Sequence, residues 1–143
     1  MLVRLLYASR IAPDAEETAI EAILQQSRAN NPRSGITGVL CHNGEIFMQA
    51  LEGGRNAVSA LYNRIAADPR HCDVILLSYE EIAERTFAGW TMGLVSLNKI
   101  SPCALLKYSE RAVLDPYSVS GEISMLLLKD LIATAQIVGR TTA

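Results

Sequence analysis

The chain has 143 residues, half of them apolar and a fifth charged, which predicts one globular domain with a full core. With 13 basic and 15 acidic residues, the net charge of −2 gives no electrostatic reason to expect a nucleic-acid partner. Arg4 and Arg10 interrupt the N-terminal apolar run, which excludes a signal peptide, and no apolar run is long enough for a bilayer. We therefore expect a cytoplasmic protein. Its three cysteines and two histidines form no metal-binding motif.

The first predicted elements are a strand and a helix. Residues 2–8 form a short apolar run, which favours a strand. Asp14 fits an N-cap with Glu17 as its capping-box partner, and the apolar spacing that follows favours an amphipathic helix. Pro32 ends this helix, because the residue before a proline is pushed out of the helical region.

A hairpin and a second helix follow. Strands are predicted at 36–42 and 45–52, joined by the Asn43–Gly44 turn. Asn-Gly is a strong hairpin signal, and we expect positive φ at both turn residues. An amphipathic spacing over 58–65 predicts the second helix, which ends near Asp68.

Two further strands complete the order of elements. Residues 74–79 form a continuous apolar run, typical of a strand covered on both faces, and residues 92–97 predict one more strand. The order strand-helix-strand-strand-helix-strand is the split arrangement of ferredoxin-like domains. The predicted fold is therefore α+β, a ferredoxin-like βαββαβ sandwich with an extra strand and both helices on one sheet face.

The tail can supply the cover that the second sheet face needs. Ser101 opens a short helix, and Ser118 or Ser120 caps a longer one that ends near Gly139. We therefore expect C-terminal helices packed on the sheet.

The sequence offers little support for an enzyme. It lacks a nucleophile-elbow motif, a His-Glu zinc motif and a P-loop, and we expect neither catalysis nor a metal. Small hydrolases of the acylphosphatase type share the ferredoxin-like order, and Arg10 stands where such an enzyme needs an arginine. However, Pro13 and Asp14 make a poor phosphate cradle.

Two polar side chains fall on neighbouring strands among apolar residues. Because side chains alternate along a strand, Tyr7 shares a face with Val3 and Leu5, and Gln49 shares one with Phe47. A buried amide or phenol without a partner costs on the order of 1–3 kcal/mol. Tyr7 and Gln49 therefore either bond each other and the backbone, or face a ligand.

Further polar candidates lie near the ends of the two helices. Ser27, Asn30 and Asn31 can face one way, and an asparagine amide suits a planar heterocycle with a carbonyl beside an N–H. Their alternative role is to cap the helix. Arg64 could hold a phosphate or complement the helix dipole.

A series of motifs runs in order over roughly the first two-thirds of the chain. They are Arg4–Ser9, Ser27–Asn31, Gly35–Gly38, Phe47–Gly53, Asp68–His71 and Phe87–Met92. In this order they resemble the motifs of the BLUF family of flavin photoreceptors, and those at 35–38 and 49–53 are the most specific. Thr91 stands where the family commonly has serine.

The resemblance implies a blue-light photoreceptor that binds flavin non-covalently, as FAD or alternatively FMN. Tyr7 would donate an electron and a proton to the excited flavin, and the Gln49 hydrogen bonds would then rearrange. The implied photoactive residues are Tyr7, Gln49, Trp90 and Met92. The implied flavin contacts are Tyr7, Ile23, Ser27, Asn30, Asn31, Gln49, Arg64, Ile65, Asp68 and His71.

The resemblance also implies how the chain is organised and what it signals to. A BLUF flavin-binding domain would span 1–97, and a C-terminal helical extension would span 98–143, as in short stand-alone members. Such members are often homo-oligomers that act through a separate downstream protein, for example a response-regulator-like one. A light-insensitive binding domain that has kept the pocket is the remaining alternative.

Overall fold

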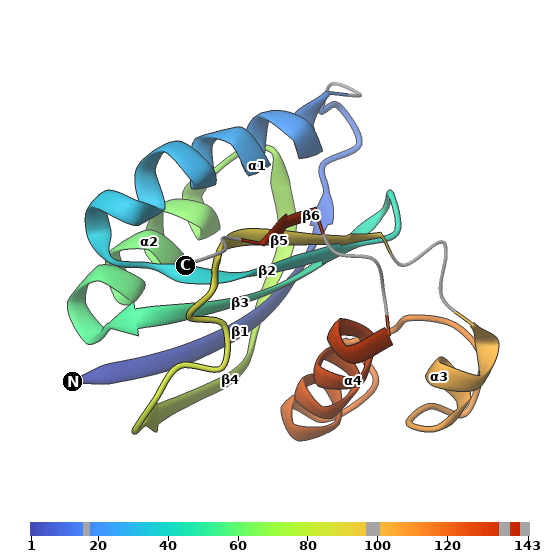
Figure 1. The fold of residues 1–143 in the computed structure, drawn as a ribbon. Helices are drawn as coiled ribbons and strands as arrows, with labels where there is room; N and C mark the ends of the chain where they lie inside the picture. The colour runs from blue at the N-terminus through green and yellow to red at the C-terminus, as the bar shows by residue number, and fades with distance from the viewer. Residues whose placement is uncertain (16–17, 97–100, 135–137, 141–143) are drawn as a thin grey trace.

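The structure is a computed structural model that describes residues 1–15, 18–96, 101–134 and 138–140. Figure 1 shows α1 and α2 on one side of a sheet, with α3 and α4 on the other. The elements are β1 (Leu2–Ile11), α1 (Ala19–Asn30), a 3₁₀ helix (Asn31–Ser34), β2 (Thr37–His42), β3 (Ile46–Gly54), α2 (Arg55–Ala67), β4 (His71–Ile82), β5 (Trp90–Ser96), α3 (Pro102–Leu106), α4 (Gly121–Thr134) and β6 (Val138–Arg140).

The sheet has the strand order β4-β1-β3-β2-β5-β6. Its first four strands pair antiparallel in the ferredoxin-like order, which confirms the predicted fold class. The additional strand β5 runs parallel to β2. Tyr7 and Gln49 stand directly opposite each other in the β1–β3 register, so the sheet itself brings these two side chains together.

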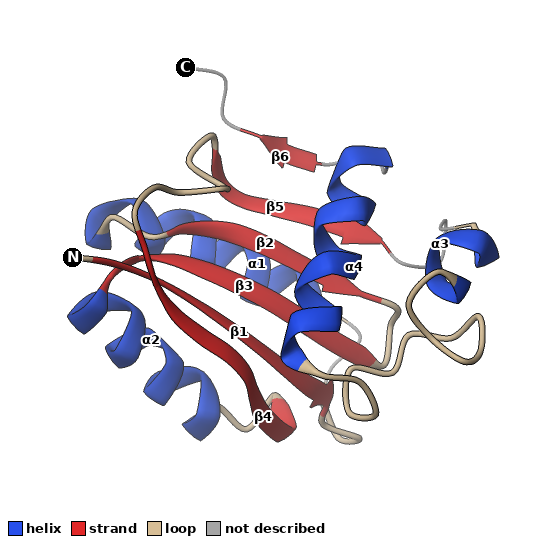
Figure 2. Ribbon diagram, turned by 90° about the horizontal axis from the view of Figure 1, so that it is seen from below, coloured by secondary structure: helices blue, strands red, loops and turns tan. Residues whose placement is uncertain are grey.

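Two hydrophobic cores lie on the two faces of the sheet. The core under α1 and α2 contains Tyr7, Ile23 and Met92, and the core under α4 contains Leu6, Met48 and Leu128. Because successive strand residues point to opposite faces, Leu6 and Tyr7 belong to different cores. Figure 2 shows α4 lying across the strands, which confirms the predicted cover of the second sheet face.

The first helix starts later than predicted. Residues 12–15 form a turn in which the Ala15 N–H donates to the Ala12 carbonyl at 2.9 Å. The N-cap is Thr18 and not Asp14, so the predicted N-cap is wrong, and its partner Glu17 lies outside the described residues.

The predicted hairpin forms, but its turn works differently. Gly44 has a positive φ of 90°, as expected, but Asn43 does not have a positive φ. Among the described non-glycine residues, positive φ occurs at Asp73. The Asn43 side-chain oxygen instead accepts from the backbone N–H groups of Glu45 and Ile46 at 3.0 and 2.8 Å. A side-chain hydrogen bond therefore closes the turn that positive φ was expected to make.

The prediction that the 74–79 strand is covered on both faces is wrong. This segment lies in β4, at the edge of the sheet. Ile75, Leu76 and Tyr79 are 43 %, 47 % and 43 % exposed. The apolar run forms a strand as expected, but an edge position leaves much of its surface in contact with solvent.

The tail helices begin where predicted and end earlier. Ser101 caps α3 by accepting from the Cys103 N–H at 3.2 Å, and Ser120 accepts from the Ile123 N–H at 3.1 Å. The helix α4 ends at Thr134, whereas Gly139 lies in β6, which pairs antiparallel with β5. The predicted helix end near Gly139 is therefore wrong.

Gly121, the first residue of α4, packs against the backbone of β4. A Cβ at this position would collide with the Leu77 carbonyl oxygen and lie 2.7 Å from its carbon. We expect Gly121→Ala to displace α4 and lower the free energy of unfolding by about 1–3 kcal/mol, despite the better helix propensity of alanine. The exposed change Lys129→Ala on the same helix is the control and should cost less than about 0.5 kcal/mol. Chemical denaturation measures both; equal stabilities would contradict the close packing.

Candidate functional site

A cavity of about 570 Å³ lies between α1 and α2 on their side of the sheet. This volume is within the usual range for small-molecule sites. Every residue predicted to contact the flavin lines it. The lining residues are Tyr7, Ile23, Gln26, Ser27, Asn30, Asn31, Arg33, Ser34, Gln49, Leu61, Arg64, Ile65, Asp68, Arg70 and His71.

The inner wall of the cavity carries a buried chain of hydrogen bonds. The Tyr7 hydroxyl donates to Gln49 Oε1 at 2.5 Å, and Gln49 Nε2 donates to Met92 Sδ at 3.3 Å. Tyr7 and Met92 are fully buried and Gln49 is 2 % exposed. Burial, with Tyr62 and Asp68 nearby, raises the pKa of the Tyr7 phenol far above its ordinary value. The phenol therefore keeps its proton. Of the two alternatives left open, Tyr7 and Gln49 bond each other, and both residues also line the cavity.

Met92 and Trp90 lie on opposite faces of the sheet. Met92 belongs to the core under α1 and α2, whereas Trp90 packs against the core under α4 and stacks on Phe87 with ring centroids 5.9 Å apart. Strand alternation would place both side chains on one face. The pairing of β5 with β6 shifts register between Trp90 and Leu94, and this irregularity accompanies the change of face. Trp90 is therefore not brought into the cavity.

Asn31 brings a buried polar group without a partner to the cavity lining. It is 3 % exposed, and its Nδ2 has no hydrogen-bond partner among the described residues. A buried amide without a partner costs on the order of 1–3 kcal/mol, so a ligand carbonyl beside Nδ2 would be favourable. Ser27 and Asn30 lie nearby in the last turn of α1 and are more exposed. Asn31 also follows α1 as its C-cap residue, so capping and ligand binding are compatible.

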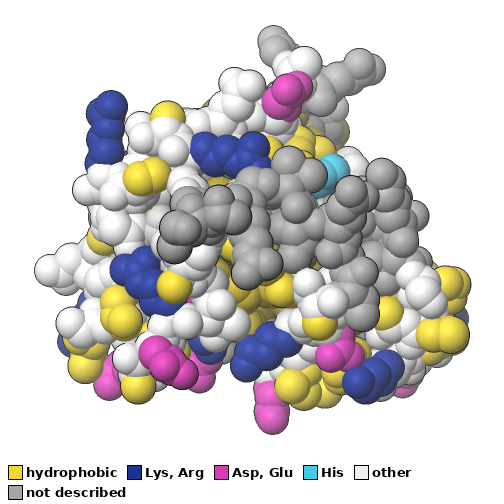
Figure 3. Space-filling model, in the orientation of Figure 1, with side chains coloured by type: hydrophobic (Ala, Val, Ile, Leu, Met, Phe, Trp, Pro, Cys, Tyr) yellow, Lys and Arg dark blue, Asp and Glu magenta, His cyan; other side chains and the backbone are white. Residues whose placement is uncertain are grey.

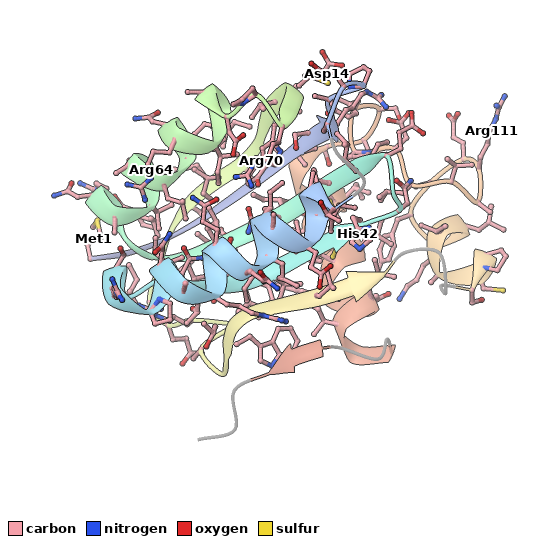
Figure 4. All side chains as sticks on the ribbon, turned by 90° about the horizontal axis from the view of Figure 1, so that it is seen from above. Met1, Asp14, His42, Arg64, Arg70 and Arg111 are labelled. Carbon is pink, nitrogen blue, oxygen red and sulfur yellow. The ribbon has the colours of Figure 1, made fainter. Side chains whose placement is uncertain are left out.

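Charged side chains form part of the cavity lining. Arg70 Nε donates to both Asp68 oxygens at 3.0 Å, and Arg70 Nη2 donates to Gln26 Oε1 at 2.8 Å. Figure 4, which views the helices from above, shows Arg70 between α2 and α1. The hydrogen bond from Arg70 lowers the pKa of Asp68, so this carboxyl is charged at neutral pH. Arg64 lies in the last turn of α2, where it lines the cavity and also complements the helix dipole.

His71 joins the cavity to β1. Its Nδ1 is 2.8 Å from Ser9 Oγ, and its ring packs edge-on to the Tyr7 ring with centroids 6.4 Å apart. Burial lowers the pKa of His71, which keeps the imidazole neutral beside the Tyr7 phenol.

Five lining residues were not among the predicted flavin contacts: Gln26, Arg33, Ser34, Leu61 and Arg70. Helical spacing could have found two of them. Gln26 lies four residues before Asn30, and Leu61 lies four residues before Ile65, so each shares a helix face with a predicted contact.

Other functional classes find little support in the described part of the chain. Arg10 lies 3.5 Å from both Glu45 and Asp73 and stacks over the Tyr117 ring, which leaves no arginine in a phosphate cradle after β1. On the face shown in Figure 3, the described basic side chains are dispersed. The described residues contain no cluster suited to a metal ion. Among the helices described, none has the length and apolarity needed to cross a membrane.

The cavity fits a flavin. Its polar edge, with the unsatisfied Asn31 Nδ2 and the Gln49 amide, suits the carbonyl and N–H groups of an isoalloxazine ring. Ile23 and Ile65 line it from the two helices and supply apolar surface for the faces of the ring.

The comparisons with known proteins agree with this fit. The chain is 36 % identical over 92 residues to photoactivated adenylate cyclase subunit beta of Euglena gracilis. The matched region covers 64 % of this chain and 11 % of that protein. It is 35 % identical over 97 residues to the blue light- and temperature-regulated antirepressor BluF of Escherichia coli (strain K12), which covers 68 % of this chain and 24 % of that protein. The chain thus spans about a tenth and a quarter of the length of these two relatives.

A solved structure and a family model complete the comparison. The photo-activated state of BlsA matches with a TM-score of 0.86 and 29 % identity, over 100 % of both chains. The model of the BLUF family, described as sensors of blue light using FAD, matches residues 2–93. These matches confirm the resemblance that the motifs indicated, and the chain belongs to the BLUF family of flavin-binding blue-light sensors.

Proposed function

We propose that the chain holds FAD between α1 and α2 and reports blue light through Tyr7 and Gln49. The observation that supports this most directly is the buried hydrogen-bond chain from Tyr7 through Gln49 to Met92 at the inner wall of the cavity. A bound flavin, once excited by blue light, supplies an acceptor for an electron and a proton.

The residues of the chain have distinct parts in this response. Tyr7 gives up the electron and the proton at its hydroxyl, which its raised pKa keeps protonated in the dark. Loss of that proton removes the donor of the bond to Gln49 Oε1, so the amide rotates or changes tautomer. Gln49 Nε2 then leaves Met92 Sδ, and the altered amide presents a different hydrogen bond to the cavity. The electron and the proton return to Tyr7, so its hydroxyl is restored while the amide keeps its new arrangement. Burial of Tyr7 and Gln49 keeps water from competing for these bonds.

The other lining residues bind and orient the ring. The amide of Asn31 would bond the polar edge of the flavin, with Ser27 and Asn30 beside it. Ile23 and Ile65 would pack on the two faces of the ring. Arg64, Asp68 and His71 would hold the ribityl-phosphate side, and Arg64 and Asp68 bring charged groups to that part of the cavity lining. FAD is the flavin we expect, with FMN as the alternative.

The change at Gln49 is passed on through Met92 to β5 and to the C-terminal segments. Trp90 takes part from the other sheet face, where it packs against the core under α4. We infer a sensor and not an enzyme, divided into a flavin-binding domain at 1–97 and an extension at 98–143. It acts in the cytoplasm as a homo-oligomer, through a separate and response-regulator-like protein. The relatives support a link to varied outputs, since one is a photoactivated cyclase subunit and another an antirepressor.

One spectroscopic experiment tests this function. The purified chain is mixed with FAD, freed of excess flavin, and measured in the dark and after a blue-light pulse. We expect a yellow protein whose flavin absorption shifts slightly to the red and returns in the dark. A chain that takes up flavin but shows no shift would be a light-insensitive binding domain, and one that takes up none would contradict the proposal.

A further inference from the structure

Arg28 on α1 contacts the strand that carries Met92. Its Nε and Nη2 both donate to the Met92 backbone carbonyl, at 3.3 and 3.2 Å. Arg28 lies half-buried in the last turn of α1, and Figure 1 shows this helix over β2 and β5. Hydrogen bonds from a charged donor are stronger than those from a neutral one. The helix that lines one side of the cavity is therefore joined to β5 at Met92.

The contact falls near the start of the pairing between β5 and β2. The parallel pairing of β2 with β5 is recorded from Val39–Gly93 onward, one residue after Met92. On the other edge, the pairing with β6 shifts register between Trp90 and Leu94. Arg28 thus holds the Met92 backbone just before the pairing with β2 begins and within the register shift of the pairing with β6.

Met92 is held at both ends. The guanidinium of Arg28 fixes its carbonyl, and its Sδ accepts from Gln49 Nε2 at 3.3 Å. The length of this second contact depends on where the Met92 backbone lies. Fixing the carbonyl therefore fixes the acceptor that Gln49 uses when its oxygen faces Tyr7.

We propose that Arg28 is a positioning residue of the light-sensing site, which holds Met92 in place so that Gln49 returns to its dark arrangement. This inference rests on the proposed function, in which Gln49 leaves Met92 after illumination. Without Arg28, the Met92 carbonyl is free to shift, and Gln49 must find its acceptor again in a looser site. The thermal return to the dark state is then slower.

The test measures dark recovery after a blue-light pulse in the flavin-loaded chain. We expect Arg28→Ala to slow recovery by roughly threefold to tenfold. A tenfold slowing corresponds to an activation barrier for the return step that is about 1.4 kcal/mol higher. Arg28→Lys keeps one charged donor and should recover at an intermediate rate. Arg111→Ala, which removes an exposed arginine outside the cavity, is the control and should recover as the unchanged chain does.

A double-mutant cycle separates positioning from simple bracing of the helix. Met92→Leu removes the sulfur acceptor, so Arg28→Ala should add little further slowing in that background. If the two effects multiply, or if both Arg28 variants recover within about twofold of the unchanged chain, the inference is wrong. If Arg28→Ala does not fold, the Arg28→Lys rate and its dependence on Met92 decide. A chain that itself shows no red shift would instead refute the proposed function.

Discussion

Tyr7→Phe is expected to abolish the light-induced red shift while the protein still binds flavin and stays folded. The variant keeps the ring that packs beside Tyr62 and His71 and loses the hydroxyl that donates to Gln49 Oε1 at 2.5 Å. Because the proton and electron leave from that hydroxyl, the yield of the shifted state should fall by about a hundredfold or more. Absorption spectra before and after illumination, at equal flavin loading, measure this yield.

Tyr62→Phe is the matched control for this change. The Tyr62 ring centroid lies 5.8 Å from that of Tyr7, but Tyr62 is less buried and does not line the cavity. Its loss should leave the amplitude of the red shift nearly unchanged. A full shift in Tyr7→Phe, or an equal loss in both variants, would show that Tyr7 is not the donor.

The parts of the fold and site that local pattern determines could be predicted from the sequence. Alternation along β1 and β3 placed Tyr7 and Gln49 among apolar neighbours, and the ferredoxin-like order of elements predicted that their two strands belong to one sheet. The flavin contacts came from the family resemblance, and the structure places all of them around one cavity. Helix spacing supports this placement for Ile23, because one face of α1 points toward the sheet.

The features that depend on pairing between distant segments could not be predicted. An apolar run such as 74–79 has the same appearance in a central strand and in the edge strand β4, since its exposure depends on which strands flank it. The register shift near Trp90 leaves no mark in the spacing of apolar residues, so the sheet face of this side chain could not be predicted. The strand β6 has three residues, which is too short for a period-two pattern to appear.

The carboxylate of Glu52 connects the strand that carries Gln49 to the segment before β5. Glu52 is fully buried, and its Oε2 accepts from Arg4 Nε at 2.9 Å and from the Thr86 N–H at 3.0 Å. Its Oε1 accepts from the Phe87 N–H at 2.6 Å. Gln49 lies three residues earlier on β3. The same strand therefore carries the Gln49 amide and the carboxylate that binds the backbone just before β5. The sequence marked this glutamate as part of a family motif, but its partners come from segments more than thirty residues away.

Glu52→Gln is therefore expected to lower the free energy of unfolding by about 3 kcal/mol, since the amide removes the buried counter-charge of Arg4 and turns a donor toward other donors. Glu80→Gln is the matched control, because Glu80 also accepts from Arg4, at 2.7 Å, but its side chain is 51 % exposed. Its loss should cost less than about 1 kcal/mol. Denaturant unfolding of the two variants at equal flavin loading compares them. Equal losses would mean that the hydrogen bonds from the Thr86 and Phe87 N–H groups to Glu52 add nothing to the free energy of unfolding. The strand β5 would then be held in place by its contacts with β2 and Arg28.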